Sequence, residues 1–333
     1  MPVTVIALRQ GVGGARLVGL GSHRPDTTVG SAEIAARFGR TGDWIRERTG
    51  IVSRRFAAGN EAMEAMAVAA GTKALARAGY GPGEIDLVIV ATCSVRSPVP
   101  VRAATVAKAL GAPGAAAFDV NAACAGFCYA MAVASDLVRA GSARRVLVIG
   151  TEKMSEWVDP TDLGTSIIFA DGAGAAVVEA ADEPGIGPIV WGSDGAAESA
   201  DLIEIPVGGQ MRMQGQSVFR WATTEIHPIA LLACERAGIR PGDLAAIVPH
   251  QANLRIIEAL ARKIDAPDAV IARDVVESGN TSAASIPMAL DRLVVDRLVD
   301  PGGLALLIGF GAGLTYAAQV VRMPTKVPAP VTA

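Results

Sequence analysis

Short apolar runs separated by glycine and polar residues recur along the whole chain. The segments "IDLVIVATCS", from Ile85, and "GLALLIGFGAG", from Gly303, each stay apolar for about eight residues before the pattern breaks. Uninterrupted runs of this length predict strands that are covered on both faces, as in parallel α/β sheets. They are too short for a membrane helix, which needs roughly 20 residues. The pattern therefore predicts a globular α/β protein without a membrane span.

The same pattern occurs twice at a fixed distance. "RAGYGPGEIDLVIVATCS" begins at Arg77, and "RAGIRPGDLAAIVPHQA" begins 159 residues later at Arg236. The same offset places "VLVIG" on "ALLIG". We therefore predict two duplicated α/β halves, each with a helix, a Pro-Gly turn, a buried strand, a loop, a helix and a second buried strand. The predicted parts are a flexible extension over 1–14, a first half over 15–182, a second half over 183–324 and a disordered tail over 325–333.

Composition narrows the class of protein. The chain has 333 residues, is 51% hydrophobic and carries a formal net charge of −3, which fits a soluble protein with one large core or two joined cores. Its first residues lack the basic flank and small-residue cleavage site that are expected of a secretory signal, and its four cysteines lack the paired spacing of zinc sites. We therefore expect a cytoplasmic protein without a metal. The slightly acidic charge disfavours nucleic-acid binding, and arginine, far more frequent than lysine, is typical of a high-GC bacterial genome.

The segment "NAACAGFCYAM" places two cysteines where a helix is predicted to begin. Cys124 lies just before the apolar helical pattern, and Cys128 lies one turn further along. A helix N-terminus favours a thiolate, which is the form that attacks a carbonyl group. We expect Cys124 to be a nucleophile and Cys128 to pack in the core. The alternative for Cys124 is a small buried residue without a chemical role.

Two further residues follow predicted strand ends or turns. His250 comes directly after the buried run "LAAIV" and a proline, and Asn280 lies in "SGNTSAAS". Under the 159-residue offset Cys124 falls on Ala283, so the loops that carry these three residues can converge at the carboxyl edges of the two sheets. A structural histidine and an N-cap asparagine are the alternatives. We expect the other two histidines, His23 and His227, to be structural.

These segments resemble a known family. "FDVNAACAGF", "VPHQANLRII" and "GNTSAASIPMAL" are similar to the three active-site segments of β-ketoacyl-acyl carrier protein synthase III, a condensing enzyme of the thiolase superfamily. "WIRERTGI", "FADGAGAAVV" and "GFGAGLTYAA" match the family as well, and the likeness runs from about Ala15 to Pro324. The resemblance implies a thiolase-like fold with five layers, α-β-α-β-α.

The resemblance also implies a mechanism. Cys124, His250 and Asn280 would form the Cys-His-Asn triad, and the backbone amides of Cys124, Gly311 and Gly313 would form the oxyanion hole. Cys124 would accept an acyl group from acyl-CoA, and malonyl-acyl carrier protein would then lose carbon dioxide and attack the acyl-cysteine. No metal or redox cofactor would be needed, and the enzyme would be a homodimer.

Further residues would bind the substrates. By resemblance, the CoA contacts would be Trp44, Arg48, Leu163, Phe219 and Ala252, although relatives usually carry an arginine where this chain has Leu163. Val99 would border the acyl pocket across the dimer. The acyl carrier protein would dock on basic residues, namely Arg220, Arg255, Arg262 and Lys263.

Other functions compete with this one. A synthase III-like acyltransferase that acylates an alcohol or amine is the first alternative, and a non-catalytic partner subunit is the second. The three triad residues are all present, which disfavours the partner subunit. Glycines in "GVGGARLVGLGS" precede the first predicted strand and do not follow one, which disfavours nucleotide binding. The acyl chain length and the pathway, fatty acid or polyketide, stay open.

Overall fold

The protein folds as two similar five-stranded sheets with helices between and outside them. Residues 11–195 and 197–326 are described by a computed structural model. The first sheet has the order β1-β7-β6-β4-β5. Its strands are β1 (Gly14–His23), β4 (Leu87–Ala91), β5 (Ala116–Val120), β6 (Arg145–Lys153) and β7 (Asp171–Ala181).

The second sheet repeats this arrangement, in the order β12-β11-β13-β14-β8. Its strands are β8 (Val190–Ser193), β11 (Ala246–Pro249), β12 (Val270–Ile271), β13 (Leu304–Gly311) and β14 (Thr315–Arg322). In the first sheet Leu87 pairs with Val146, and in the second Ala246 pairs with Ala305, so both partners of the pair are displaced by the predicted 159 residues. The two halves therefore pair their equivalent strands in the same register.

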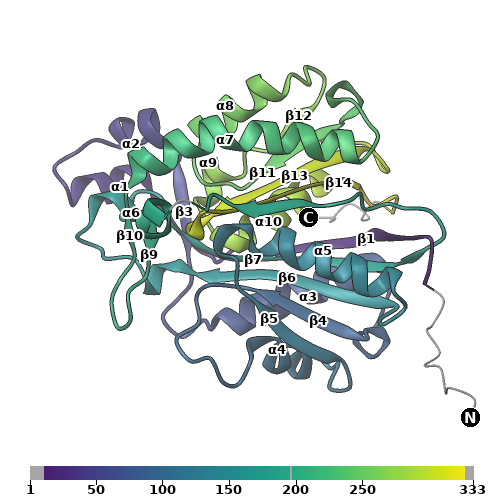
Figure 1. The fold of residues 1–333 in the computed structure, drawn as a ribbon. Helices are drawn as coiled ribbons and strands as arrows, with labels where there is room; N and C mark the ends of the chain where they lie inside the picture. Colours follow the sequence, from purple (N-terminus) through teal and green to yellow (C-terminus); the bar gives the residue numbers. More distant parts are fainter. Residues whose placement is uncertain (1–10, 196, 327–333) are drawn as a thin grey trace, which may run out of the picture.

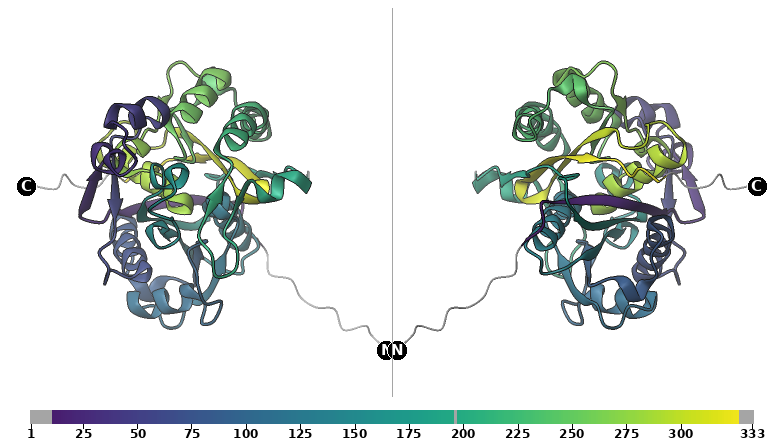
Figure 2. Two further views of the ribbon diagram at one scale, coloured as in Figure 1. Left: turned by 90° about the vertical axis from the view of Figure 1, so that its left-hand side faces the viewer. Right: turned by 90° about the vertical axis from the view of Figure 1, so that its right-hand side faces the viewer.

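Helices complete the five layers (Figures 1 and 2). The outer face of the first sheet is covered by α3 (Met63–Ala78) and α4 (Arg102–Leu110), and the outer face of the second by α7 (Gly215–Arg236) and α8 (Leu254–Ile264). Between the sheets lie α5 (Gly126–Arg139) and α10 (Ser285–Val295). Both central helices are nearly all buried, because each packs against strands of both sheets. The predicted α-β-α-β-α arrangement is confirmed.

Shorter elements lie around one end of the sheets. They are β2 (Thr27–Gly30), α1 (Ser31–Ala36), α2 (Gly42–Thr49), β3 (Ser53–Phe56), α6 (Leu163–Ser166), β9 (Ile203–Glu204), β10 (Arg212–Met213) and α9 (Val275–Ser278). The predicted boundary at 182/183 falls between β7 and β8. The predicted N-terminal extension and C-terminal tail lie mostly outside the described residues, but residue 14 already belongs to β1.

Candidate active site

Cys124 lies in a tight turn between β5 and α5. A short 3-10 turn over Ala123–Ala125 leads into the helix, and Ala123 has a left-handed φ of 46°. Gly311, at the end of β13, passes so close that a Cβ there would lie 2.8 Å from the Cys124 Cβ, which only glycine avoids. Cys128 is completely buried in the central core. The predicted helix begins at Gly126 with Ala125 as its N-cap, so Cys124 lies in the turn before it, and the predicted packing of Cys128 in the core is confirmed.

His250 is the first residue after β11. Its backbone N–H donates to Ile308 of β13 at 2.7 Å, which fixes the residue at the sheet end. The ring Nδ1 lies 2.8 Å from the Ser285 hydroxyl, and the Phe310 ring meets the imidazole edge-on with the centroids 5.2 Å apart. Burial lowers the pKa of His250 to about 3. The imidazole is therefore neutral at physiological pH.

Asn280 lies between α9 and α10 and is held by its backbone. Its N–H donates to Ile168 at 3.0 Å, and its carbonyl accepts from Ala170 at 2.9 Å. The side-chain Oδ1 accepts from the Ser282 N–H at 2.8 Å. Because Oδ1 is committed to Ser282, Nδ2 is the group that Asn280 can offer to a ligand.

The three predicted catalytic residues line one cavity of about 560 Å³. Gly311, Phe219 and Ala252, which were predicted to contact the substrates, line it as well. Most of the remaining wall is apolar, with Met154, Trp157, Ile168, Phe169, Ile205 and Met211 among its residues. A cavity with a few convergent polar groups on an apolar wall is typical of a small-molecule site.

A buried carboxylate beside this cavity was not predicted. Glu152, in β6, is completely buried, and its carboxylate accepts hydrogen bonds from the hydroxyls of Thr92, Ser94 and Ser282. The backbone N–H groups of Cys93 and Ser94 donate to it too. Burial raises the pKa of Glu152, while these hydrogen bonds oppose that shift. A charged residue at the end of the apolar run "VLVIGT" was the sequence signal that could have located it.

Glu152 and Ser282 affect the pKa of Cys124. Burial raises the pKa of Cys124 to about 12; the Ser282 hydroxyl, hydrogen-bonded to Cys124, lowers it, and the Glu152 charge raises it further. Desolvation of the sulfur thus opposes the predicted effect of the helix N-terminus and favours the thiol over the thiolate.

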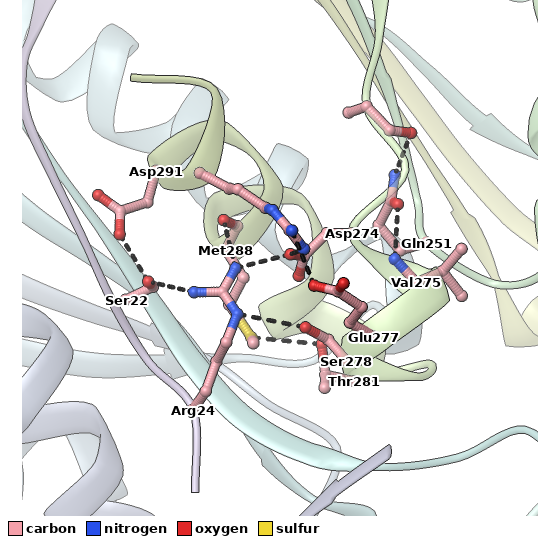
Figure 3. A network of polar contacts seen from close by, with 12 residues as sticks. Ser22, Arg24, Gln251, Asp274, Val275, Glu277, Ser278, Thr281, Met288 and Asp291 are labelled. Atoms are coloured by element: carbon pink, nitrogen blue, oxygen red, sulfur yellow. Dashed lines mark hydrogen bonds and ion pairs between the residues drawn. The ribbon is translucent and has the colours of Figure 1, made fainter. Parts of the chain in front are cut away.

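A network of polar contacts supports the loops that carry His250 and Asn280 (Figure 3). Arg24, which follows β1, donates to Asp274 at 2.7 Å and to the Ser278 hydroxyl at 3.2 Å, both in or next to α9. Gln251, next to His250, accepts from the Val275 N–H at 3.1 Å. The network therefore fixes α9, which leads into Asn280, against the loop after β11.

The predicted CoA contacts divide into two groups. Phe219 and Ala252 line the cavity, whereas Trp44, Arg48 and Leu163 do not. The latter three lie together, because Trp44 and Leu163 pack in one apolar cluster and the Arg48 guanidinium lies 4.0 Å from the Trp44 ring centroid. Gly313 and Val99 do not line the cavity either. Val99 is 76% exposed in the single chain.

The four predicted docking cations lie on α7 and α8. Arg220, Arg262 and Lys263 are exposed, and Lys263 donates to the Thr223 carbonyl, which ties α8 to α7. Arg255 also makes hydrogen bonds within the protein that were not predicted. Its guanidinium donates to the carbonyls of Glu47, at 3.0 Å, and Arg46, at 3.3 Å, and so holds the end of α2.

Over residues 11–195 and 197–326, no cluster of three or more His, Cys, Asp or Glu side chains could hold a metal ion. Within the same ranges no helix is long and apolar enough to cross a membrane.

Comparison with known proteins identifies the family. The family models "3-Oxoacyl-[acyl-carrier-protein (ACP)] synthase III" and its C-terminal counterpart match residues 118–195 and 234–323. A β-ketoacyl-acyl carrier protein synthase III of Streptomyces coelicolor is 52% identical, over 93% of this chain and 99% of its own length. A synthase III of Mycobacteroides abscessus is 49% identical, over 97% and 98%.

Solved structures agree. The priming β-ketosynthase of a polyketide biosynthetic pathway superposes with a TM-score of 0.92 at 44% identity, covering 98% of this chain and all of its own. The 3-oxoacyl-(acyl carrier protein) synthase III of Pseudomonas aeruginosa superposes with a TM-score of 0.89 at 37% identity, covering 95% of this chain and all of its own. The chain therefore belongs to the β-ketoacyl-acyl carrier protein synthase III family of condensing enzymes.

Proposed function

We propose that the protein condenses an acyl primer, delivered as acyl-CoA, with malonyl-acyl carrier protein to give 3-oxoacyl-acyl carrier protein. The product would start a fatty-acid or polyketide chain. The observation that carries this proposal is the convergence of Cys124, His250 and Asn280 on one cavity in a member of this family. The presence of all three residues favours condensation over acyl transfer to an alcohol or amine.

The first half-reaction is acylation of Cys124. The sulfur attacks the acyl-CoA carbonyl, the oxyanion is held by backbone N–H groups of Cys124 and the Gly311 to Gly313 loop, and CoA leaves as a thiol. The close approach of Gly311 to Cys124 brings this loop to the nucleophile. No metal or redox cofactor takes part in the proposed reaction.

The second half-reaction is decarboxylative condensation. His250 Nε2–H and Asn280 Nδ2–H donate to the thioester carbonyl of the malonyl group, which stabilises the enolate formed as carbon dioxide leaves. The enolate carbon then attacks the acyl-cysteine carbonyl and expels the Cys124 thiolate. Both donors are neutral, which suits them to a developing negative charge, because a carboxylate at either position would repel it.

The substrates would arrive over α7 and α8. The exposed cations Arg220, Arg262 and Lys263 lie on these two helices, and Phe219 of α7 lines the cavity and is 39% exposed. A local basic surface on an acidic protein suits an acidic carrier protein. Trp44 and Arg48 would hold the CoA nucleotide, with Leu163 beside them.

We also propose that the protein is a cytoplasmic homodimer. Among the described strands β5 pairs with β4 alone, so its other edge, with half-buried side chains from Ala117 to Val120, is available to a second copy. Such a dimer would cover the exposed Val99 and bring it to the partner's acyl pocket.

The reaction is tested with purified protein, a panel of acyl-CoAs and malonyl-acyl carrier protein. The proposal predicts release of carbon dioxide and a carrier protein whose mass has increased by the 3-oxoacyl group. Transfer of the acyl group to an added alcohol or amine, without consumption of malonyl groups, would instead identify an acyltransferase.

A further inference from the structure

The proposed acylation removes a proton from the Cys124 sulfur. Burial raises the pKa of this thiol to about 12, and an acyl-cysteine carries no S–H bond. The proton must therefore leave the sulfur as the sulfur attacks the acyl-CoA carbonyl. A base connected to the sulfur by hydrogen bonds would accelerate this step.

His250 is poorly suited to be that base. Its Nε2–H is the proposed donor to the malonyl carbonyl, and its Nδ1 is already engaged with the Ser285 hydroxyl at 2.8 Å. Burial also lowers the pKa of His250 to about 3, so the imidazole resists taking up a second proton. The amide of Asn280 is not basic. The proton acceptor for Cys124 must therefore be a different group.

The carboxylate of Glu152 lies one side chain away from the sulfur. The Ser282 hydroxyl donates to Glu152 Oε1 at 3.1 Å and is also hydrogen-bonded to Cys124. The short turns that carry the two cavity residues, Ala123–Ala125 and Ser282–Ala284, pack against each other. Cys124 and Ser282 both line the cavity, whereas Glu152, which is completely buried, does not. Ser282 therefore connects the nucleophile to a carboxylate that solvent does not reach.

The surroundings of Glu152 favour its ionised form before the reaction. Besides Ser282, its carboxylate accepts hydrogen bonds from neutral donors, namely the hydroxyls of Thr92 and Ser94 and the backbone N–H groups of Cys93 and Ser94. These donors stabilise the carboxylate, while burial raises its pKa and so favours uptake of a proton. Glu152 is thus ionised by its hydrogen bonds and made more basic by its burial.

Proton transfer within this group creates no additional buried charge. A thiol beside a carboxylate becomes a thiolate beside a carboxylic acid, so the site keeps one negative charge throughout. The Glu152 charge, which disfavours the Cys124 thiolate, disappears when the proton arrives. Burying a second charge would be far more costly.

We propose that Ser282 and Glu152 form a proton relay for Cys124. As the sulfur attacks the acyl-CoA carbonyl, its proton passes to Ser282 Oγ, and the Ser282 hydroxyl proton passes to Glu152 Oε1. CoA leaves as a thiolate and takes a proton from water. When condensation later expels the Cys124 thiolate, the proton on Glu152 returns by the same path. The inference rests on the proposed acylation of Cys124.

Ser282→Ala removes the bridging hydroxyl and should keep the turn. Ser282 has a left-handed φ of 48°, and Ala123, at the equivalent position of the first half, has a φ of 46° with an alanine side chain. The backbone N–H of residue 282, which donates to Asn280 Oδ1, is retained. We expect the single-turnover rate of Cys124 acylation at saturating acyl-CoA, read by intact-protein mass spectrometry, to fall about 100-fold or more. The half-saturating concentration of acyl-CoA should change little, because the hydroxyl acts on the reaction and not on binding.

The second half-reaction supplies a readout that a merely structural role would not give. Acyl-enzyme is first formed by prolonged incubation and is then mixed with malonyl-acyl carrier protein. This step expels Cys124 as a thiolate and needs no base to activate the sulfur. Ser282→Ala should therefore condense within about threefold of the wild-type rate, although its acylation is slow.

Two further variants test the carboxylate. Glu152→Gln keeps the size of the side chain but cannot take up the proton, so it should slow acylation and spare condensation as Ser282→Ala does. Thr92→Val is the matched control, because the Thr92 hydroxyl donates to Glu152 at 3.0 Å but Thr92 does not line the cavity. This variant removes a hydrogen bond from the carboxylate without breaking the path from Cys124. Its acylation should fall much less than that of Ser282→Ala.

The outcomes separate the relay from the proposed function. Wild-type acylation in Ser282→Ala, equal loss of both half-reactions in that variant, or an equally large loss in Thr92→Val would overturn the relay alone. If Glu152→Gln does not fold, Ser282→Ala and Thr92→Val still decide the question. Failure of every acyl-CoA to acylate the wild-type protein would overturn the proposed function and the relay with it.

Discussion

His250 Nδ1 lies 2.8 Å from Ser285 Oγ, and the same hydroxyl oxygen accepts the Gln251 backbone N–H at 3.2 Å. The Ser285 hydroxyl has one proton to donate, and when it donates that proton to Nδ1 the proton of the neutral imidazole is on Nε2. This is the tautomer that the proposed condensation step uses. Ser285 was not predicted as a functional residue.

The neutral state of His250 predicts how stability depends on pH. Burial lowers the pKa of His250 to about 3, below the value of about 6.5 in the unfolded chain, so below pH 6.5 the unfolded state binds more protons. The contribution of His250 to the free energy of unfolding should therefore decrease as the pH falls. Between pH 7.5 and pH 5.0, wild type should lose about 2 kcal/mol more free energy of unfolding than His250→Ala, measured by denaturant titration. Asn280→Ala, as the control, should retain the wild-type dependence; equal losses in wild type and His250→Ala would contradict the buried neutral histidine.

Asn280→Asp should separate the two half-reactions. An aspartate keeps the oxygen that accepts the Ser282 N–H, so the local turn should persist. Its charge, however, would stand where the enolate forms, and we expect the barrier to condensation to rise by about 2.7 to 4 kcal/mol, as for loss of one oxyanion donor. Acylation of Cys124 by acyl-CoA, followed by mass spectrometry, should survive. If both steps are lost equally, Asn280 has only a structural role.

Leu163→Arg should strengthen binding of the CoA nucleotide. A guanidinium on an aromatic ring contributes roughly 0.5 to 2 kcal/mol, so an arginine on the adenine should lower the apparent KM for acyl-CoA by about two- to thirtyfold. The apparent KM for acyl-pantetheine, which lacks the nucleotide, should not change. Leu163→Met, which preserves the apolar packing with Trp44, is the control. If neither donor's curve moves in Leu163→Arg, this segment does not meet the adenine.

Glu152→Ala should destabilise the fold much more than removal of a surface carboxylate. The change leaves the hydroxyls of Thr92, Ser94 and Ser282 without their acceptor, and each buried orphan costs about 1 to 3 kcal/mol. We expect a loss of about 3 kcal/mol or more in denaturant unfolding. Glu156→Ala, which removes a half-exposed partner of Lys153, should cost less than about 1 kcal/mol. Similar small losses in the two variants would show that Glu152 does not organise this site.

The duplication could be predicted from sequence because it is carried by uninterrupted apolar strands. The duplication includes the active-site loops, where Ala123 and Ser282, 159 residues apart, have φ values of 46° and 48°. The two halves therefore present the same left-handed turn, followed by Cys124 in one and Ala283 in the other. Of the three predicted catalytic residues, His250 follows a strand end that the apolar pattern marks, whereas Cys124 follows β5 and Asn280 lies between α9 and α10.

Other features could not be predicted. β5, with the sequence "AAFDV", is an edge strand of partly exposed residues, so it has no apolar run to mark it. The pKa of Cys124 depends on the burial of its loop and on the charge of Glu152. Both depend on contacts between segments that are distant in the sequence. Arg255 was predicted to dock the acyl carrier protein, and its hydrogen bonds to the end of α2 could not be predicted because they join segments that are distant in the sequence.

The most direct test of this account is the mass of the intact protein after incubation with acyl-CoA. Wild type and Cys128→Ala should gain one acyl group, located on Cys124 by peptide mapping, and malonyl-acyl carrier protein should then remove it as 3-oxoacyl-acyl carrier protein. Cys124→Ala should gain none. If Cys124→Ala still carries the acyl group, or Cys128→Ala loses it, the nucleophile is not Cys124 and the proposed mechanism is wrong.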